Sequence, residues 1–297
     1  MEEQNIFLAG SGTMGTGIAQ TALQGGYNVF LYDTAKGAPE MAIASIKERF
    51  ARSVEKGKLT MDEMTCMMSR ISPAELQAAA DCSIVIEAVF ENIDVKSAFF
   101  KQIGGIVNER TMLGTNTSSI SISALASFVP QPERFIGTHF FVPAPVMKLL
   151  EIVRGLCTSD VTIARAKEMG KRMGKTTIVV KDMPCFLVNR LVDPLVNEGV
   201  QLLEEGVGTV EDIDNGVKVA LNHPMGPLEL IDLMGLDVAL AVMETLHHDF
   251  GDPKYRPSTL LRRMVKAGLL GKKSGKGFYC YDENGKNFGV NPIFNIR

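Results

Sequence analysis

The 297-residue sequence lacks the features of several large classes of protein. No window of about 18 consecutive residues is wholly apolar, so we expect no membrane-spanning helix and no membrane partner. The N-terminus is acidic and its apolar run stops at Gly10, which does not fit a secretory signal peptide. The 31 Lys and Arg residues are matched by 34 Asp and Glu, a net charge of −3. This balance argues against a dedicated nucleic-acid-binding protein.

Signals for disulfides and for metal sites are also missing. The five cysteines are odd in number, lie far apart and include no CxxC pair, so we expect reduced thiols and a cytoplasmic location. There are four histidines, and none shares a metal-ligand spacing with a cysteine. His247 and His248 are adjacent, so a helix would point them apart. We therefore expect no bound metal.

What remains is an ordinary globular composition, 45% hydrophobic and 22% charged, in a chain long enough for two domains. Short β-type runs alternate with helical stretches in the first part of the chain; the runs are 6–9, 27–32, 83–88, 112–115, 135–138, 149–153 and 176–180. This alternation predicts a parallel sheet covered on both faces. After Pro184 the pattern is helical, at 186–206, 209–221, 227–249 and 257–267, with one weak strand at 277–281. We expect an α/β domain over residues 1–184 and an all-α domain over 185–297.

A glycine-rich segment follows the first predicted strand and precedes a helix. It reads GSGTMG and matches the pattern GxGxxG, in which the glycines allow a tight turn, a close backbone approach to a pyrophosphate and close helix–strand packing. The N-terminus of the following helix offers N–H groups to phosphate. Glycines also occur in ordinary turns, but this context favours a Rossmann-type dinucleotide site. Its expected contacts are Gly10, Gly12, Thr13, Met14 and Gly15.

Asp33 follows the second predicted strand, 18 residues beyond Gly15. A carboxylate there can bind the adenosine 2′-hydroxyl and repels the 2′-phosphate of NADP. We therefore expect NAD as the cofactor, with NADP less favoured, although Lys36 lies near enough to weaken the preference. The alternative is that Asp33 only ends a strand.

An enzyme that oxidises an alcohol with a nicotinamide needs a group to take the hydroxyl proton, and the ordinary pKa of histidine, about 6.5, suits this task. His139 ends a predicted strand at the sheet edge where such folds bind ligands. Glu151 lies on the next strand and could orient the imidazole. A polar run at 115–119 could place hydroxyls on a substrate oxygen and the Asn116 amide on the nicotinamide. The alternatives are a buried structural histidine and an N-cap for a helix over 121–128.

With these residues in place, the sequence resembles the short-chain L-3-hydroxyacyl-CoA dehydrogenase family, in particular its bacterial 3-hydroxybutyryl-CoA dehydrogenases. The resemblance covers nearly the whole length and rests on GSGTMGTGIAQ, IEAVFENIDVK, TNTSSISI, THFFVPAPVMKLLEIVRG, FLVNR, NHPMGPLELIDLMGLDV and GKKSGKGFYCY. It implies NAD-dependent, reversible oxidation of a short-chain L-3-hydroxyacyl-CoA to the 3-oxoacyl-CoA. It also implies a homodimer formed through the helical C-terminal half.

The resemblance also implies roles for single residues. The family's catalytic histidine falls on His139 and its partner acid on Glu151. The serine and asparagine that contact substrate fall on Ser118 and Asn189, and Glu91 matches a position near the nicotinamide half of the cofactor.

Coenzyme A carries phosphates, so a basic rim is expected near the acyl-CoA site. Residues 47–58 hold five basic and two acidic side chains, a net charge of +3, and from them we expect Arg52 and Lys56 to contact coenzyme A. A solvated helix face is an equal alternative.

Two positions depart from the family pattern. Val142 stands where an asparagine usually follows His-Phe-Phe, and Cys185 stands where glycine is favoured. Loss of a polar contact at a buried site costs about 1–3 kcal/mol. Three alternatives follow, namely a dehydrogenase for a dicarboxylic acyl-CoA, one for a hydroxy acid without coenzyme A, and a weakly active NAD-binding protein.

Overall fold

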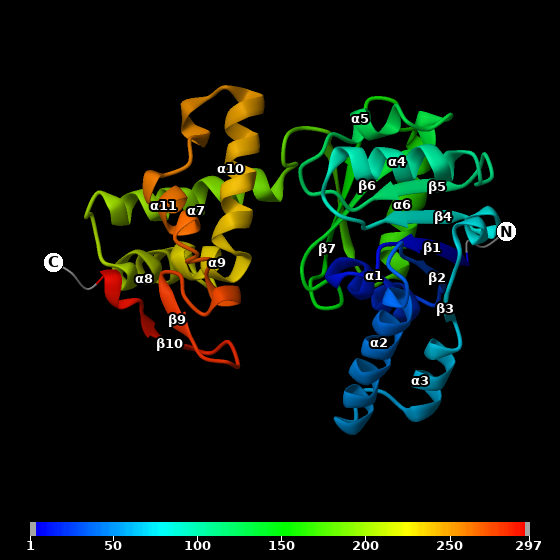
Figure 1. Ribbon diagram of the computed structural model, residues 1–297, viewed down its shortest axis with the longest axis horizontal. Helices are drawn as coiled ribbons and strands as arrows, with labels where there is room; N and C mark the ends of the chain where they lie inside the picture. The colour runs from blue at the N-terminus through cyan, green and yellow to red at the C-terminus, as the bar shows by residue number, and fades with distance from the viewer. Residues whose placement is uncertain (1–3, 295–297) are drawn as a thin grey trace. The chain divides into compact units, whose positions relative to one another are not determined.

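The computed structural model describes residues 4–294, and the chain divides into two compact units between Met183 and Pro184 (Figure 1). The N-terminal unit is built on one eight-stranded sheet with the strand order β3-β2-β1-β4-β5-β6-β7-β8. The strands are β1 (Asn5–Ala9), β2 (Asn28–Tyr32), β3 (Ile71–Pro73), β4 (Ile84–Glu87), β5 (Met112–Thr115), β6 (Phe135–Phe140), β7 (Leu149–Arg154) and β8 (Thr176–Lys181). Its helices are α1 (Thr13–Gln24), α2 (Ala38–Glu55), α3 (Met61–Met68), α4 (Ile93–Gly104), α5 (Ile122–Ala126) and α6 (Asp160–Arg172).

The prediction of an all-parallel sheet is wrong at one edge. Along the sheet from β3 through β2, β1, β4 and β5 to β6, neighbouring strands are parallel. Strand β7 pairs antiparallel with β6, and β8 is parallel to β7. The connection between β6 and β7 is only residues 141–148, too short for the crossover of a dozen or more residues that a parallel pair needs. Strand β3 was also not predicted, because it has three residues and ends in a proline.

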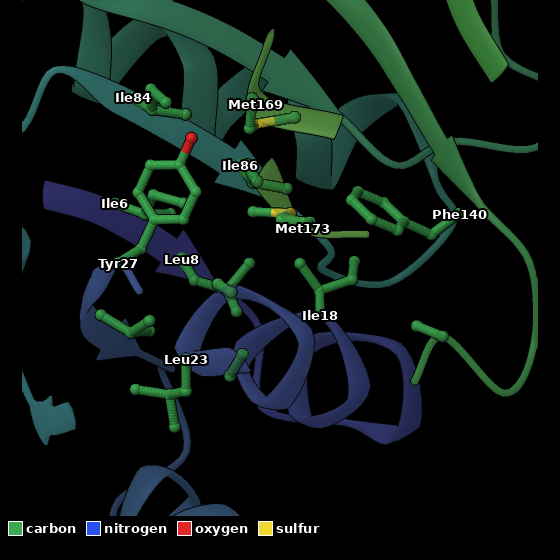
Figure 2. Close-up of a cluster of buried hydrophobic side chains, with 14 of the residues drawn as sticks. Ile6, Leu8, Ile18, Leu23, Tyr27, Ile84, Ile86, Phe140, Met169 and Met173 are labelled. Carbon is green, nitrogen blue, oxygen red and sulfur yellow. The ribbon is translucent and has the colours of Figure 1, made fainter. Parts of the chain in front are cut away.

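Both faces of this sheet are covered. On one face, Ile6 and Leu8 of β1 and Ile84 and Ile86 of β4 pack with side chains of α1 and α6, among them Ile18 and Met169 (Figure 2). On the other face, Phe100 of α4 meets Phe135 of β6 edge to face, with ring centroids 4.7 Å apart. Strands buried on both sides read as near-continuous apolar runs, which is why they were visible in the sequence.

The C-terminal unit is mainly helical. It contains α7 (Val188–Glu204), α8 (Val210–Leu221), α9 (Pro227–Met234), α10 (Leu236–Phe250) and α11 (Thr259–Lys266), together with a small sheet of β9 (Tyr279–Tyr281) and β10 (Asn287–Val290). Its core includes Val196, Val200, Leu228, Ile231 and Phe278. Among residues 4–294, no helix combines the length and the apolarity needed to cross a bilayer.

Two helix boundaries in this unit differ from the prediction, and each difference has a backbone cause. The single helix expected over 227–249 is two helices, because Gly235 between them has φ +99°, outside the helical region. The helix expected from 186 begins at Val188, because Cys185 and Phe186 have φ values of +58° and +59°. Apolar spacing continues through both places, so periodicity alone did not mark them.

Candidate functional site

The glycine-rich loop joins β1 to α1 and has the close contacts that the pattern requires. Gly10 has φ +101°, and a side chain there would collide with the carbonyl group of Ala88, which follows the neighbouring strand β4. A side chain at Gly15 would collide with the carbonyl group of Gly10. Gly12 has open space where a side chain would stand, and as the N-cap of α1 it provides no side-chain cap. The first N–H groups of α1 therefore face an open approach, which fits a pyrophosphate.

A cavity of about 690 Å³ adjoins this loop. Its lining combines Gly10, Gly12, Thr13 and Met14 with the end of β2, the segment 88–90 and one face of α4. Among these, Asp33 and Thr34 follow β2, and Val95, Ala98, Phe99 and Gln102 lie on α4. The site lies at the carboxyl ends of the paired strands β1 and β4, where the strand order reverses, the point at which open α/β sheets bind dinucleotides.

Asp33 stands at the rim of this cavity and is held by neutral donors. Its Oδ2 accepts hydrogen bonds from Ser11 N at 2.8 Å and Ser11 Oγ at 2.7 Å, and its Oδ1 accepts one from Ala35 N at 2.9 Å. Partial burial acts to raise the pKa of this carboxyl, but these hydrogen bonds outweigh it and leave the pKa below its ordinary value. Asp33 is therefore ionised at neutral pH. Sequence reasoning missed the part played by Ser11, a variable position in the motif.

His139 and Glu151 form a buried pair on neighbouring strands. They stand opposite each other in the antiparallel register of β6 and β7, and His139 Nδ1 lies 2.7 Å from Glu151 Oε2. Glu151 is fully buried and His139 is 6% exposed. When the Glu151 carboxylate is ionised it only accepts hydrogen bonds, and this geometry then makes Nδ1 the donor of the pair. The Phe141 ring lies beside the imidazole, with centroids 4.6 Å apart.

The polar run after β5 is organised around Glu91. Glu91 Oε1 accepts hydrogen bonds from Thr117 Oγ1 at 2.6 Å, Ser118 N at 2.8 Å and Ser118 Oγ at 3.3 Å. The Asn116 side chain turns to β6, where its Oδ1 accepts the Phe140 N–H at 2.9 Å. The N-cap of α5 is Ser121, outside the run, so capping does not account for residues 115–119.

Lys96 is a site residue that sequence reasoning missed. It lies on α4 with only 1% of its side chain exposed, and its ammonium contacts both Glu87 and Glu91. Burial raises the pKa of Glu87, whereas for Glu91 the charge of Lys96 and the hydrogen bonds from the turn outweigh burial and lower the pKa. The sequence held one signal for this burial, because Lys96 is spaced three and four residues from Phe99 and Phe100 on an otherwise apolar helix face.

Other expected residues lie apart from these contacts. Arg52 is on α2, largely exposed, with Nη2 3.9 Å from Glu48 Oε2, and Lys56 follows the end of the same helix. Asn189 is in the first turn of α7, in the C-terminal unit. Val142 is 61% exposed, so the expectation that it fills a buried polar position is wrong. Within residues 4–294, no group of three or more His, Cys, Asp or Glu side chains could hold a metal ion.

Comparisons with known proteins show the family of this chain. The family profile described as "3-hydroxyacyl-CoA dehydrogenase, NAD binding domain" matches residues 5–183, and "3-hydroxyacyl-CoA dehydrogenase, C-terminal domain" matches residues 186–281. The chain is 47% identical over 284 residues to a probable 3-hydroxybutyryl-CoA dehydrogenase of Bacillus subtilis, covering 95% of this chain and 99% of that protein. It is 43% identical over 279 residues to the 3-hydroxybutyryl-CoA dehydrogenase of Bradyrhizobium diazoefficiens, covering 94% and 95%.

A solved structure gives the same result. The (S)-3-hydroxybutyryl-CoA dehydrogenase of Ralstonia eutropha superposes with a TM-score of 0.92 at 45% identity, covering 95% of this chain and all of that one. Its family shares the NAD-binding domain and the helical domain found here. The chain therefore belongs to the 3-hydroxyacyl-CoA dehydrogenase family and is an NAD-dependent oxidoreductase.

Proposed function

We propose that this protein catalyses the reversible NAD-dependent oxidation of a short-chain L-3-hydroxyacyl-CoA, such as 3-hydroxybutyryl-CoA, to the 3-oxoacyl-CoA. The observation that carries the proposal is the 2.7 Å pair of His139 and Glu151 at the carboxyl end of β6. It lies in the same unit as the glycine-rich loop and its cavity. A base at the edge where the sheet binds ligands is what alcohol oxidation requires.

In this mechanism His139 Nε2 takes the proton of the substrate hydroxyl. The glycine-rich loop and Asp33 would hold NAD, which would supply the hydride acceptor. Glu151 holds the imidazole through Nδ1 and stabilises the positive charge that it gains. In the reverse direction His139 returns the proton to the carbonyl oxygen. The Phe141 ring packed beside the imidazole limits its rotation.

The substrate oxygens need hydrogen-bond donors as charge develops on them. We assign this role to Ser118 and Asn189, which hydrogen-bond the reacting oxygen or the thioester carbonyl. The Ser118 N–H donates to Glu91 Oε1 at 2.8 Å, which supports a fixed position for this residue, and its hydroxyl would exchange the longer 3.3 Å bond to Glu91 for one to the substrate oxygen. Glu91 and Asn116 are assigned to the nicotinamide half of NAD, and Gly10, Gly12, Thr13, Met14, Gly15 and Asp33 to the rest of it.

The remaining parts of the proposal concern the rest of the molecule. Arg52 and Lys56 are assigned to the phosphates of coenzyme A, which their exposure allows. Residues 185–297 are proposed to form the homodimer, supported by apolar side chains exposed on this unit, including Leu191, Val219 and Leu221 at 68%, 84% and 59%. The five free cysteines support a reducing, cytoplasmic location. The proposed dimer is tested by sedimentation equilibrium of the wild type and of a Leu191→Lys/Val219→Lys variant. A monomeric wild type would contradict the proposal.

The substrate is tested by following loss of NADH absorbance with acetoacetyl-CoA, free acetoacetate and a dicarboxylic 3-oxoacyl-CoA. We expect turnover of acetoacetyl-CoA with a kcat/KM of about 10⁴–10⁸ M⁻¹s⁻¹, in the range of natural enzymes. A higher kcat/KM for free acetoacetate or for the dicarboxylic thioester would replace the proposed substrate with that compound. No turnover of any of the three would favour a non-catalytic NAD-binding protein.

A Val142→Asn variant belongs in the same assay. Because Val142 is 61% exposed, we expect kcat/KM within about threefold of the wild type. A large gain of activity on restoring the asparagine would instead mean that Val142 weakens the wild-type enzyme or changes its specificity.

A further inference from the structure

Lys96 is a buried cation placed between two acids. Its Nζ lies 2.6 Å from Glu87 Oε1 and 3.2 Å from Glu91 Oε2, and it donates a longer hydrogen bond, 3.4 Å, to the carbonyl oxygen of Val89. Glu87 ends β4, Glu91 lies in the segment before α4, and Lys96 is on α4 itself. One ammonium therefore joins three consecutive pieces of the chain at the carboxyl edge of the sheet.

Each of the two acids that contact Lys96 is also hydrogen-bonded to a different part of the site. Glu87 Oε2 accepts a hydrogen bond from Thr115 Oγ1 at 2.7 Å, at the end of β5. Glu91 Oε1 accepts the Thr117 hydroxyl at 2.6 Å and the Ser118 N–H at 2.8 Å. The turn of residues 117–119, which we call the serine turn, is thus bound to a carboxylate that is itself bound to Lys96.

The charges explain why the cation is needed. Glu87 is fully buried, and a second carboxylate close to it cannot easily stay ionised unless a positive charge compensates both. Removing one partner of such a cluster leaves an uncompensated buried charge, which is far more costly than losing the whole cluster. A protonated Glu91 would accept the hydrogen bonds of the serine turn less strongly, because hydrogen bonds to an ionised acceptor are about twice as strong.

We propose that Lys96 is a positioning residue for the dehydrogenase reaction, whose charge keeps Glu91 ionised and so fixes the serine turn and the Ser118 hydroxyl. The inference rests on the proposed function, which gives Ser118 its contact with the substrate. Lys96 itself does not touch the reacting atoms in this scheme. It acts through Glu91.

The test compares Lys96→Met, Glu87→Gln and the double variant, with Lys101→Met as the control on the exposed side of the same helix. We expect Lys96→Met to lower kcat/KM for acetoacetyl-CoA by about 100-fold at pH 7, the range for a lost buried charged contact. Relative to the wild type at the same pH, the kcat/KM of Lys96→Met should fall further as the pH drops from 8.5 to 5.5, because the loss of Lys96 raises the pKa of Glu91. Lys101→Met should behave as the wild type.

The double variant separates charge from packing. Glu87→Gln removes the second carboxylate while keeping its shape, so the double variant has the net charge of the wild-type cluster, −1 with both acids ionised, without the lysine. We expect it to recover at least about tenfold of the lost kcat/KM and to lose the added pH dependence. If the double variant is as poor as Lys96→Met at every pH, Lys96 acts by packing alone and the proposal is wrong. Because it avoids the second uncompensated carboxylate, the double variant is also the one to examine if Lys96→Met does not fold.

A second readout does not depend on turnover. Amide hydrogen exchange of a peptide covering residues 115–120, corrected for the intrinsic rate at each pH, reports directly on the serine turn. We expect faster exchange in Lys96→Met, most of all at low pH, and wild-type exchange in Lys101→Met. An unchanged exchange rate in Lys96→Met overturns the inference. If the wild type lacks acetoacetyl-CoA turnover but exchange responds in this way, the proposed function has failed and the positioning role stands.

Discussion

The buried acids of the two units differ in the partners that they face. In the N-terminal unit, Glu151 meets the His139 imidazole and Glu87 meets the Lys96 ammonium. In the C-terminal unit, Asp214 and Asp232 accept hydrogen bonds from backbone N–H groups and from tyrosine hydroxyls. Glu151 and Glu87 each face a basic side chain, whereas Asp214 and Asp232 are held by neutral donors.

The neutral donors of the C-terminal unit serve to hold segments together. Asp232 accepts Phe278 N at 2.9 Å and Tyr279 N at 2.8 Å, so a carboxylate of α9 fixes the backbone at the start of β9. Burial raises the pKa of Asp232 to about 6, although the hydrogen bonds that it accepts act to lower it.

The cations of the N-terminal unit can do more than hold a segment. A histidine changes its charge near neutral pH, so its pair can take and return a proton, whereas a lysine keeps its charge and fixes what surrounds it. We therefore propose different tasks for the two buried pairs at this sheet edge, proton transfer for His139 and Glu151 and positioning for Lys96. Four substitutions test this difference, in order of the expected effect.

His139→Gln should have the largest effect, because it removes the group that takes the proton. We expect turnover to fall by about two to four decades, while the dissociation constant for NAD changes little because the glycine-rich loop is intact. Steady-state kinetics and a fluorescence titration with NADH measure the two quantities. Turnover close to that of the wild type would disprove the assignment of His139 as the base.

Glu151→Gln should cost less, because the imidazole remains and only its partner changes. Loss of a buried hydrogen bond to a charged group costs about 1.5–3 kcal/mol, which corresponds to about one to two decades in kcat. The dependence of kcat/KM on pH should shift as well, since the imidazolium loses its counter-charge. If this variant is worse than His139→Gln, the carboxylate has a more direct role than orientation.

Asp193→Asn should change stability and not catalysis. Asp193 on α7 is fully buried, its carboxylate oxygens have no hydrogen-bond partner among the described residues, and burial raises its pKa to about 7. The folded state thus binds a proton that the unfolded chain releases near pH 4, so the wild type loses stability as the pH rises from about 4 to 7.

An asparagine at position 193 does not ionise, so the variant does not lose stability as the pH rises from about 4 to 7. We expect the free energy of unfolding of Asp193→Asn to exceed that of the wild type by about 2 kcal/mol at pH 7.5 and by little at pH 4. Glu205→Gln, at the exposed end of the same helix, is the matched control in calorimetry at both values. An equal change at both pH values would show that charge is not the cause.

Asp33→Ala should have the smallest effect, because this carboxylate is only partly buried and faces neutral donors although it lies in the N-terminal unit. We expect NAD to bind about tenfold more weakly and NADP to be affected less, since the negative charge that repels its 2′-phosphate is gone. Titration of both cofactors measures the ratio. A ratio that does not move would count against the ribose contact.

Those parts of the site that depend on local pattern could be predicted from the sequence. The glycine-rich loop was visible because its backbone requires glycine, and His139 and Glu151 because they lie on successive strands joined by a short loop. The antiparallel direction of β7 could have been deduced from the length of the same loop.

Other parts could not be predicted, because they depend on how side chains meet in three dimensions. Lys96 lies in a charged stretch that reads as a solvated helix start, and only the packing of α4 on the sheet places its ammonium between two acids. The break at Gly235 was hidden for a related reason, since the apolar spacing continues on both sides of it.

The antiparallel pairing of β6 and β7 has a consequence for how the enzyme can be redesigned. The register that sets His139 against Glu151 continues to Phe140 and Leu150, the last pair before the connecting residues 141–148. The strands, and not the connection, thus fix the distance between base and acid. We expect that changes within residues 142–148, which leave Phe141 beside the imidazole, keep the distance between the His139 and Glu151 side chains.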